Sequence, residues 1–203
     1  MAERFWNWMA DRYSRQPIAD EAAYQKKLQL TREYLREDMR VLEIGCGTGS
    51  TAIVHAPHVQ HILATDLSEN MLAIARSKAL QAGVHNIDFQ CVSVDGLSLA
   101  DDSIDMVLAL SILHLLPDWR KVLPKLYRLL APGGLLVSST TCIGDMGPLM
   151  KVLPPVMRVL PLLPSVASFS EAELSSAMRE AGFELEQRWR PAPDKAAFII
   201  ARK

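Results

Sequence analysis

Apolar and polar positions along the chain follow two spacings, which separate strands from helices. Short apolar runs predict strands, and apolar residues spaced three and four apart over longer stretches predict helices. Strands are expected at residues 41–44, 62–65, 86–92, 104–110, 135–140, 183–189 and 196–201. Helices are expected at residues 3–14, 20–36, 50–56, 68–82, 117–130 and 170–182. Because strands and helices alternate from residue 40 onward, the pattern predicts an α/β fold with a parallel sheet.

Capping residues mark where several of these helices begin. Asp20 and Ser68 precede helices as N-caps, because their side chains can accept hydrogen bonds from the first free N–H groups. Ser170 followed three residues later by Glu173 is a capping-box pattern. The run at 104–110 is nearly continuously apolar, which is typical of a central parallel strand buried on both faces.

The segment 146–169 departs from this pattern because it is apolar but contains five prolines. Prolines exclude one continuous helix, so we expect short helical pieces over the sheet edge that carries the active site. Apolar positions alternate by four and three at Leu149, Leu153, Val156, Leu160 and Leu163. This stripe predicts a lid over an apolar substrate. It also fits a surface buried on the sheet, or peripheral membrane contact in which Lys151 and Arg158 meet lipid headgroups.

Composition and charge narrow the class of protein. The chain has 203 residues, 49% hydrophobic and 22% charged, as in a single globular domain. A formal net charge of -1 provides no basic field for nucleic acid. Three widely spaced cysteines argue against a disulfide framework, and neither a leader pattern nor a span of about 18 apolar residues is expected. We therefore expect a cytoplasmic protein, with monomer and homodimer both open.

The strongest local motif is the glycine-rich turn Glu-Ile-Gly-Cys-Gly-Thr-Gly at 43–49, between a strand and a helix. Glycines there allow a sharp turn and a close approach of a ligand to the backbone. Asp66 ends the next strand, 19 residues after Gly47, where a carboxylate can accept hydrogen bonds from both ribose hydroxyls. The pair predicts a nucleoside-cofactor site, the alternative being a tight turn without a ligand. Ser50 departs from the GxGxxG pattern of dinucleotide folds.

In order and spacing, four segments resemble class I S-adenosylmethionine-dependent methyltransferases of the type 11 group, which includes ubiquinone and menaquinone methyltransferases. They are residues 41–50, Asp66, the strand at 105–108 and the turn at 130–134. The resemblance implies a Rossmann-like, doubly wound fold whose seven-stranded, mostly parallel sheet has an antiparallel closing strand. It implies one domain over 1–203, made of a helical cap at 1–37, a cofactor-binding core at 38–140, an apolar substrate lid at 141–169, and a closing helix and hairpin at 170–203.

The resemblance further implies that S-adenosylmethionine is the cofactor, and it gives roles to individual residues. Glu43 corresponds to the acid that holds the methionine ammonium. Asp66 would hold the ribose, and Leu67 would flank the adenine. Further residues expected on the cofactor side are Gly45, Cys46, Gly47, Met71 and Ser111. Cys46 is interpreted as a small buried residue rather than a nucleophile, because no base is paired with it in the sequence.

Two other regions complete the expected cofactor site. The family usually has Asp-Ala after the third strand, whereas this chain has Ser93-Val94. Ser93 or Asp95 would then bond the adenine. In the first helix, Trp6 and Tyr13 are seven residues apart and share one face. They are the aromatic residues expected to close over the cofactor.

Methyl transfer from a sulfonium needs a base only where the acceptor must lose a proton. His114 is the preferred base because an unperturbed histidine titrates near neutrality, and a role in merely lining the pocket stays equally open. Tyr13 is the alternative, as a group that polarises the acceptor, and Asp145 is a third choice. No metal site is expected: His55, His58 and His61 recur every three residues, but Pro57 breaks their helix.

These features predict a methyltransferase acting on a small, apolar acceptor such as a phenol, quinol, thiol or lipid-like molecule. Nucleic-acid substrates are disfavoured because residues 110–114 read Leu-Ser-Ile-Leu-His instead of the Asn/Asp-Pro-Pro-aromatic motif. A nicotinamide-dependent oxidoreductase is the first alternative, since it would share the glycine turn and Asp66. A non-catalytic module that binds S-adenosylmethionine is the second.

Overall fold

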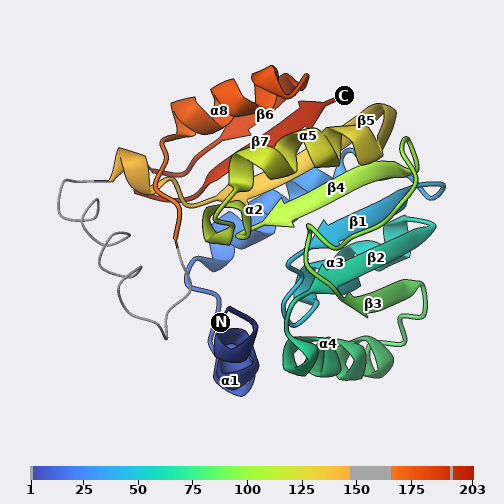
Figure 1. Ribbon diagram of the computed structural model, residues 1–203. Helices are drawn as coiled ribbons and strands as arrows, with labels where there is room; N and C mark the ends of the chain where they lie inside the picture. Colours follow the sequence, from blue (N-terminus) through green and yellow to red (C-terminus); the bar gives the residue numbers. More distant parts are fainter. Residues whose placement is uncertain (1, 147–165, 193) are drawn as a thin grey trace. The chain divides into compact units, whose positions relative to one another are not determined.

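The computed structural model describes residues 2–146, 166–192 and 194–203 (Figure 1). The chain forms two compact units, one comprising Glu3–Leu97 and the other Ser98–Lys203 together with Met1–Ala2. The apolar stripe predicted within 146–169, and with it most of the expected lid, lies outside the described residues. No helix in the described part of the chain is both long and apolar enough to span a membrane.

The described residues form a seven-stranded sheet in the order β3-β2-β1-β4-β5-β7-β6. The strands are β1 (Arg40–Ile44), β2 (His61–Asp66), β3 (Ile87–Cys91), β4 (Ile104–Leu110), β5 (Leu130–Thr140), β6 (Glu184–Trp189) and β7 (Ala197–Arg202). Each predicted strand is present, and β7 is antiparallel to both of its neighbours. The predicted mostly parallel α/β sheet with an antiparallel closing strand is confirmed.

Helices connect the strands where the sequence predicted them. They are α1 (Ala2–Ser14), α2 (Glu21–Arg32), α3 (Ser50–His55), α4 (Glu69–Gln81), α5 (Trp119–Leu129) and α8 (Glu171–Glu180), with short 3₁₀ turns η1 (Ala56–His58), η2 (Leu113–Leu115) and η3 (Ile143–Asp145). The Asp20 carboxylate accepts from the Ala23 N–H at 2.9 Å. Ser170 and Glu173 form the complete capping box. These hydrogen bonds confirm the capping predictions. The sequence could predict them because each joins residues only three positions apart.

In the unit Glu3–Leu97, three parallel strands pack around a core of aliphatic side chains. Strand β2 pairs with β1 on one side and β3 on the other. Leu42, Ile62 and Leu72 are fully buried. Because parallel strands end at the same edge, the turn after β1 lies beside the end of β2, and the Cys46 N–H donates to Thr65 O at 2.9 Å.

In the unit Ser98–Lys203, β4 pairs in parallel with β5, and the β6–β7 hairpin follows on the other side of β5. Met106, Leu108 and Phe198 are fully buried, in agreement with the apolar character of β4. Helix α5 packs on β5, and α8 packs on β6. This unit carries His114 and Ser111, which follow the carboxyl end of β4.

Two boundaries differ clearly from the prediction: α2 ends at Arg32 instead of residue 36, and β5 begins earlier than expected. The sequence predicts a turn at 131–134 before a strand at 135–140, whereas β5 already begins at Leu130. Leu130 pairs with Ile104 and Leu135 with Met106, so β5 advances five residues while β4 advances two. The extra residues form a bulge. It could not be read locally because the pairing depends on a distant strand.

Candidate functional site

The glycine turn after β1 has a backbone that favours glycine. Gly45, Gly47 and Gly49 have φ angles of 65°, 54° and 72°, in the left-handed region that other residues adopt only at a cost. The Gly49 N–H donates to Cys46 O at 3.0 Å and closes the turn. The turn therefore presents bare main chain at the carboxyl end of β1.

Two of these glycines differ in their surroundings. A Cβ placed on Gly47 has one neighbour within 4 Å, the Tyr13 ring carbon Cε1 at 3.9 Å. A Cβ on Gly49 lies 2.8 Å from Ala75 Cβ and 3.1 Å from Phe89 Cε1. Gly49 is thus required by packing against α4 and β3, whereas among the described residues a Cβ on Gly47 would meet only the Tyr13 ring.

Asp66 contacts the glycine turn directly. Its Oδ2 accepts from the Gly47 N–H at 2.8 Å, and its Oδ1 accepts from the Ser68 N–H at 2.9 Å. Burial raises the pKa of Asp66, and backbone N–H groups, among them those of Ser68 and Gly47, oppose the increase. Each carboxylate oxygen has two lone pairs, so Asp66 can accept further hydrogen bonds from a ligand. The structure brings the predicted turn and acid together.

Glu43 is the second-to-last residue of β1, and only 3% of the surface of this residue is exposed. The Ala52 N–H donates to the carboxylate, while Oε2 has no hydrogen-bond partner among the residues that the structure describes. Burial raises the pKa of Glu43 to about 8, and the nearby Asp66 charge adds to the increase. A buried acid with a free oxygen is costly for a protein on its own. It is suited to a cationic group such as an ammonium.

The end of β3 and the residue after it lie beside Asp66. Cys91 pairs with Asp66 across the strands, and the Val92 N–H donates to Asp66 O at 3.0 Å. The Ser93 Oγ accepts from the Gly96 N–H at 3.0 Å, which leaves its hydroxyl hydrogen free to donate. Asp95 in the same turn is exposed.

Leu67 is 37% exposed at the turn after β2, whereas three other predicted cofactor-side residues are buried. Cys46, Met71 and Val94 are 8%, 2% and 9% exposed. Burial raises the pKa of the Cys46 thiol far above its usual range, so the side chain is a neutral thiol and not a nucleophile. Met71 belongs to the first turn of α4, and its side chain is buried.

Helix α1 holds two aromatic rings near the glycine turn. The Trp6 and Tyr13 ring centroids are 6.3 Å apart with an interplanar angle of 87°, an edge-to-face contact. Burial and the Asp66 charge raise the pKa of Tyr13, so its phenol stays protonated at neutral pH. Trp8, on a different face of the helix, is 72% exposed.

Asn7 belongs to the same region, and the sequence did not single it out. Its Oδ1 accepts from the Ser68 hydroxyl at 2.7 Å and from the Asn70 N–H at 3.3 Å. Its backbone carbonyl accepts from the Asn70 amide at 3.0 Å. These partners are 61 and 63 residues away in the sequence. No local pattern could therefore have found them.

His114 and Ser111 are described within the unit Ser98–Lys203. Burial lowers the pKa of His114 to about 4, so the ring is neutral at physiological pH. Its Nδ1 is buried without a hydrogen-bond partner. Ser111 follows β4 with a left-handed φ of 58°, and its N–H donates to Ser139 O at 2.7 Å. Strained backbone of this kind often occurs at functional sites.

Asp145, the third candidate base, is tied into an ion pair. The Arg190 Nη1 lies 2.7 Å from its Oδ2, which also accepts from the Glu171 N–H at 3.0 Å. The Asp145 carboxylate therefore links Arg190 to the first residue of α8, Glu171, which is a structural role.

The three histidines near η1 have different environments. His55 is 1% exposed and neither ring nitrogen has a partner, while His61 Nε2 lies 3.1 Å from Asp88 Oδ2. Across residues 2–146, 166–192 and 194–203, no cluster of three or more histidine, cysteine or acidic residues is arranged to hold a metal ion.

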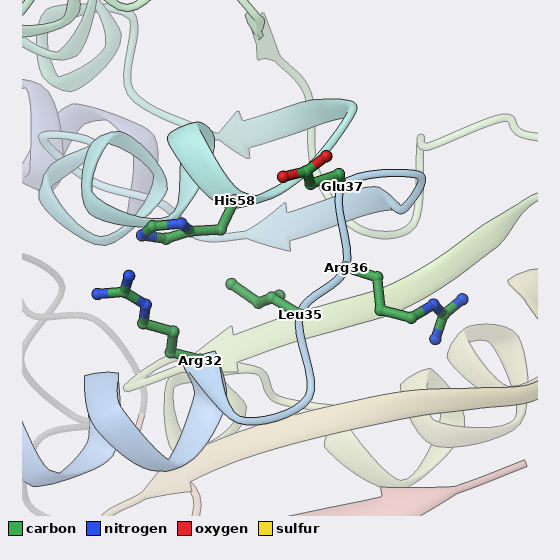
Figure 2. A pocket seen from close by; sticks show the side chains of 5 residues that line it. All are labelled: Arg32, Leu35, Arg36, Glu37 and His58. Carbon is green, nitrogen blue, oxygen red and sulfur yellow. The ribbon is translucent and has the colours of Figure 1, made fainter.

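Figure 2 shows a separate hollow at the amino ends of β1 and β2. Its lining residues are Arg32, Leu35, Arg36, Glu37 and His58. The Arg32 guanidinium and the His58 ring point toward one another, while Arg36 points away. The glycine turn and Asp66 lie at the opposite, carboxyl ends of β1 and β2. This hollow is therefore distinct from the predicted cofactor site.

Comparisons with known proteins agree with this geometry. Residues 41–134 match the model of a family described as a methyltransferase domain. The chain is 35% identical to an uncharacterized methyltransferase, YcgJ, of Bacillus subtilis, over 49% of this chain and 39% of that protein. It is 34% identical to a demethylmenaquinone methyltransferase of Listeria monocytogenes, over 53% of this chain and 46% of that protein. The matched region thus spans less than half the length of these relatives.

A solved structure supports the fold over nearly the whole chain. The S-adenosylmethionine-dependent methyltransferase of Mesorhizobium loti superposes with a TM-score of 0.75 at 22% sequence identity. The superposition covers 91% of this chain and 99% of the other. At this level of identity the likeness establishes the fold alone.

Proposed function

We propose that this chain, whose residues 41–134 match the model of a family described as a methyltransferase domain, transfers a methyl group from S-adenosylmethionine to a small, apolar acceptor. The observation that carries the proposal is the 2.8 Å contact between the Gly47 N–H and Asp66 Oδ2. The buried Glu43, with its free Oε2, lies on the adjacent strand. Bare backbone, an accepting carboxylate and a buried acid match three different parts of one cofactor.

Asp66 is suited to the ribose of that cofactor. Both of its oxygens are already oriented by backbone N–H groups, so binding requires no new side-chain ordering. The remaining lone pairs can accept from two neighbouring hydroxyls. Leu67, partly exposed beside it, offers an apolar contact for the adenine.

Glu43 is suited to the methionine ammonium. Burial removes the water that would stabilise the ionised carboxylate of Glu43. A cation placed at Oε2 would stabilise the ionised form instead and so lower the raised pKa. When bound, S-adenosylmethionine supplies a methyl group on a positively charged sulfur, and transfer leaves a neutral thioether. Catalysis can therefore rest mainly on proximity and orientation.

His114 is the residue we assign to the proton of an acceptor such as a phenol or thiol. Its ring is neutral because burial lowers its pKa to about 4, and in the tautomer that leaves Nδ1 unprotonated this nitrogen, which has no partner among the described residues, would accept a hydrogen bond from the acceptor and then its proton. Tyr13 remains a phenol because its pKa is raised. It can therefore donate a hydrogen bond to the acceptor but cannot act as the base.

Two observations support an apolar acceptor. One relative is named a demethylmenaquinone methyltransferase, and a quinone nucleus is apolar. The chain also contains an apolar segment at 146–169 with only two charged residues. Apolar residues favour apolar ligands where they line a site.

Calorimetric titration with S-adenosylhomocysteine tests the cofactor site. We expect wild-type protein to bind, and Asp66→Ala to weaken binding by about ten- to hundredfold, as for the loss of hydrogen bonds to a charged group. Asp88→Ala is the matched control, because Asp88 is an exposed acid on the neighbouring strand that pairs with His61. Its affinity should equal that of the wild type.

Two results would overturn the proposal. One is wild-type protein that gives no heat with S-adenosylhomocysteine while NADH raises its melting temperature. The other is Asp66→Ala protein with unchanged affinity.

Acceptor class is tested separately by transfer of a radiolabelled methyl group to apolar and charged small molecules. Preference for charged acceptors would contradict that part.

A further inference from the structure

We propose that Asn7 is a positioning residue that fastens helix α1 over the cofactor site and so slows the release of the cofactor. The inference rests on the proposed function, because it requires a ligand between the glycine turn and α1. It goes further by giving a role to a residue that lies outside the predicted site. All residues involved belong to the unit Glu3–Leu97.

Asn7 makes three hydrogen bonds to the start of α4, next to which α1 lies in Figure 1. Two reach its side-chain oxygen Oδ1, from the Ser68 hydroxyl at 2.7 Å and the Asn70 N–H at 3.3 Å. The third joins the Asn70 amide to the Asn7 carbonyl at 3.0 Å. The side-chain oxygen of Asn7 thus accounts for two of the three hydrogen bonds that hold the helix at the start of α4.

Ser68 connects this contact to the ribose acid. It is fully buried, its hydroxyl accepts from the Met71 N–H at 3.1 Å, and the hydroxyl hydrogen is directed at Asn7. The Ser68 N–H donates to Asp66 Oδ1, and Asp66 Oδ2 accepts from the Gly47 N–H. A continuous chain of hydrogen bonds therefore runs from α1 through α4 to the glycine turn.

Helix α1 carries the aromatic residues that border the turn. Trp6 directly precedes Asn7, and Tyr13 follows about one and a half turns later. Among the described residues, Tyr13 is the one that a Cβ on Gly47 would approach within 4 Å, and burial followed by the nearby Asp66 charge raises the pKa of Tyr13. Releasing Asn7 would allow Tyr13 to move away from the turn, which opens a path for the ligand.

The chemistry of Asn7 suggests a discriminating pair of variants. The contacts use Oδ1 and the backbone carbonyl but not Nδ2. Asn7→Asp keeps an acceptor oxygen and places a negative charge near the start of α4, where it is favourable. Asn7→Leu keeps the size of the side chain but removes the acceptor. Ser14→Ala is the matched control, because the Ser14 hydroxyl bonds within α1, to Asp11 O.

The primary measurement is the dissociation rate of S-adenosylhomocysteine from immobilised full-length protein. We expect Asn7→Leu to release it about tenfold faster, as for the loss of one or two ordinary hydrogen bonds. Asn7→Asp should stay within about twofold of the wild type, and so should Ser14→Ala. Tryptic cleavage after Arg12 and Arg15 is the second readout. Ligand should protect these bonds in the wild type and in Asn7→Asp, but not in Asn7→Leu.

The outcomes separate this inference from the proposed function. If the wild-type protein does not bind S-adenosylhomocysteine, both the proposed function and the role of Asn7 are contradicted. Wild-type binding with an unchanged dissociation rate in Asn7→Leu overturns only the role of Asn7. Equal acceleration in Asn7→Leu and Asn7→Asp also overturns it, because the acceptor oxygen would then be irrelevant. A lowered melting temperature without faster release or lost protection identifies a merely structural residue and contradicts the proposal.

Discussion

Glu43 shows how a single buried side chain can report on ligand binding. Its pKa is raised to about 8 because the carboxyl lies in the interior with one oxygen unpaired. A bound ammonium stabilises the ionised form and lowers this pKa, so binding below pH 8 releases a proton. Affinity for S-adenosylhomocysteine should therefore rise with pH toward 8, by at most about tenfold per pH unit.

Glu43→Gln tests this coupling at the same scale. The amide cannot ionise, so we expect the affinity to fall by about ten- to hundredfold and the proton release to disappear. Calorimetry in two buffers of different ionisation enthalpy measures the protons released. Release that persists in Glu43→Gln would assign the proton to another group.

Sequence reasoning worked well for residues whose partners are near in the chain. The Asp20 cap and the Ser170–Glu173 box needed only three-residue spacing. Glu43 could be assigned as the acid of the motif, but its free oxygen and raised pKa depend on everything packed around it. Asn7 had no local signal at all.

At the scale of the element, the glycine turn between β1 and α3 combines two different requirements. Gly47 and Gly49 both have left-handed backbones, yet only Gly49 is crowded, with Ala75 Cβ 2.8 Å from an added Cβ. The sequence predicted the turn. It could not distinguish a glycine that faces a ligand space from one that packs against a helix.

Paired alanine substitutions should separate these requirements. Gly47→Ala should cost about 1–2 kcal/mol of stability for the left-handed backbone, fold normally and bind S-adenosylhomocysteine poorly. Gly49→Ala adds a steric clash and should cost about 2–5 kcal/mol. Urea unfolding measures the stabilities, and calorimetry measures binding by the folded fraction. Normal binding by Gly47→Ala would show that this position does not face the cofactor.

At the scale of the whole molecule, buried ionisable groups shape the dependence of stability on pH. His55 is 1% exposed without partners, and burial lowers its pKa to about 4. The unfolded histidine titrates near 6.5, so between pH 6.5 and 4 the unfolded state binds more protons. Stability is therefore lost as the pH falls through this window. His114 acts in the same direction.

Replacing His55 should flatten the acid side of this profile. For the wild type we expect His55 to account for about 2 kcal/mol of lost stability between pH 7 and pH 5. His55→Leu removes the titrating group and two unpaired nitrogens, so its unfolding free energy should change less over the same range. Urea unfolding at the two pH values measures both. An unchanged pH dependence in the variant would exclude His55 as a source.

The amino-acid sequence by itself determined the order of strands and helices, their caps, the glycine turn and the acid that ends the next strand. These features depend on residue spacing and, for the caps, on hydrogen bonds between near neighbours. Only the tertiary structure decided the bulge in β5, the crowding at Gly49, the free oxygen of Glu43 and the attachment of α1 by Asn7. Each of these depends on atoms that folding brings together from segments far apart in the chain. No local pattern encodes such distances.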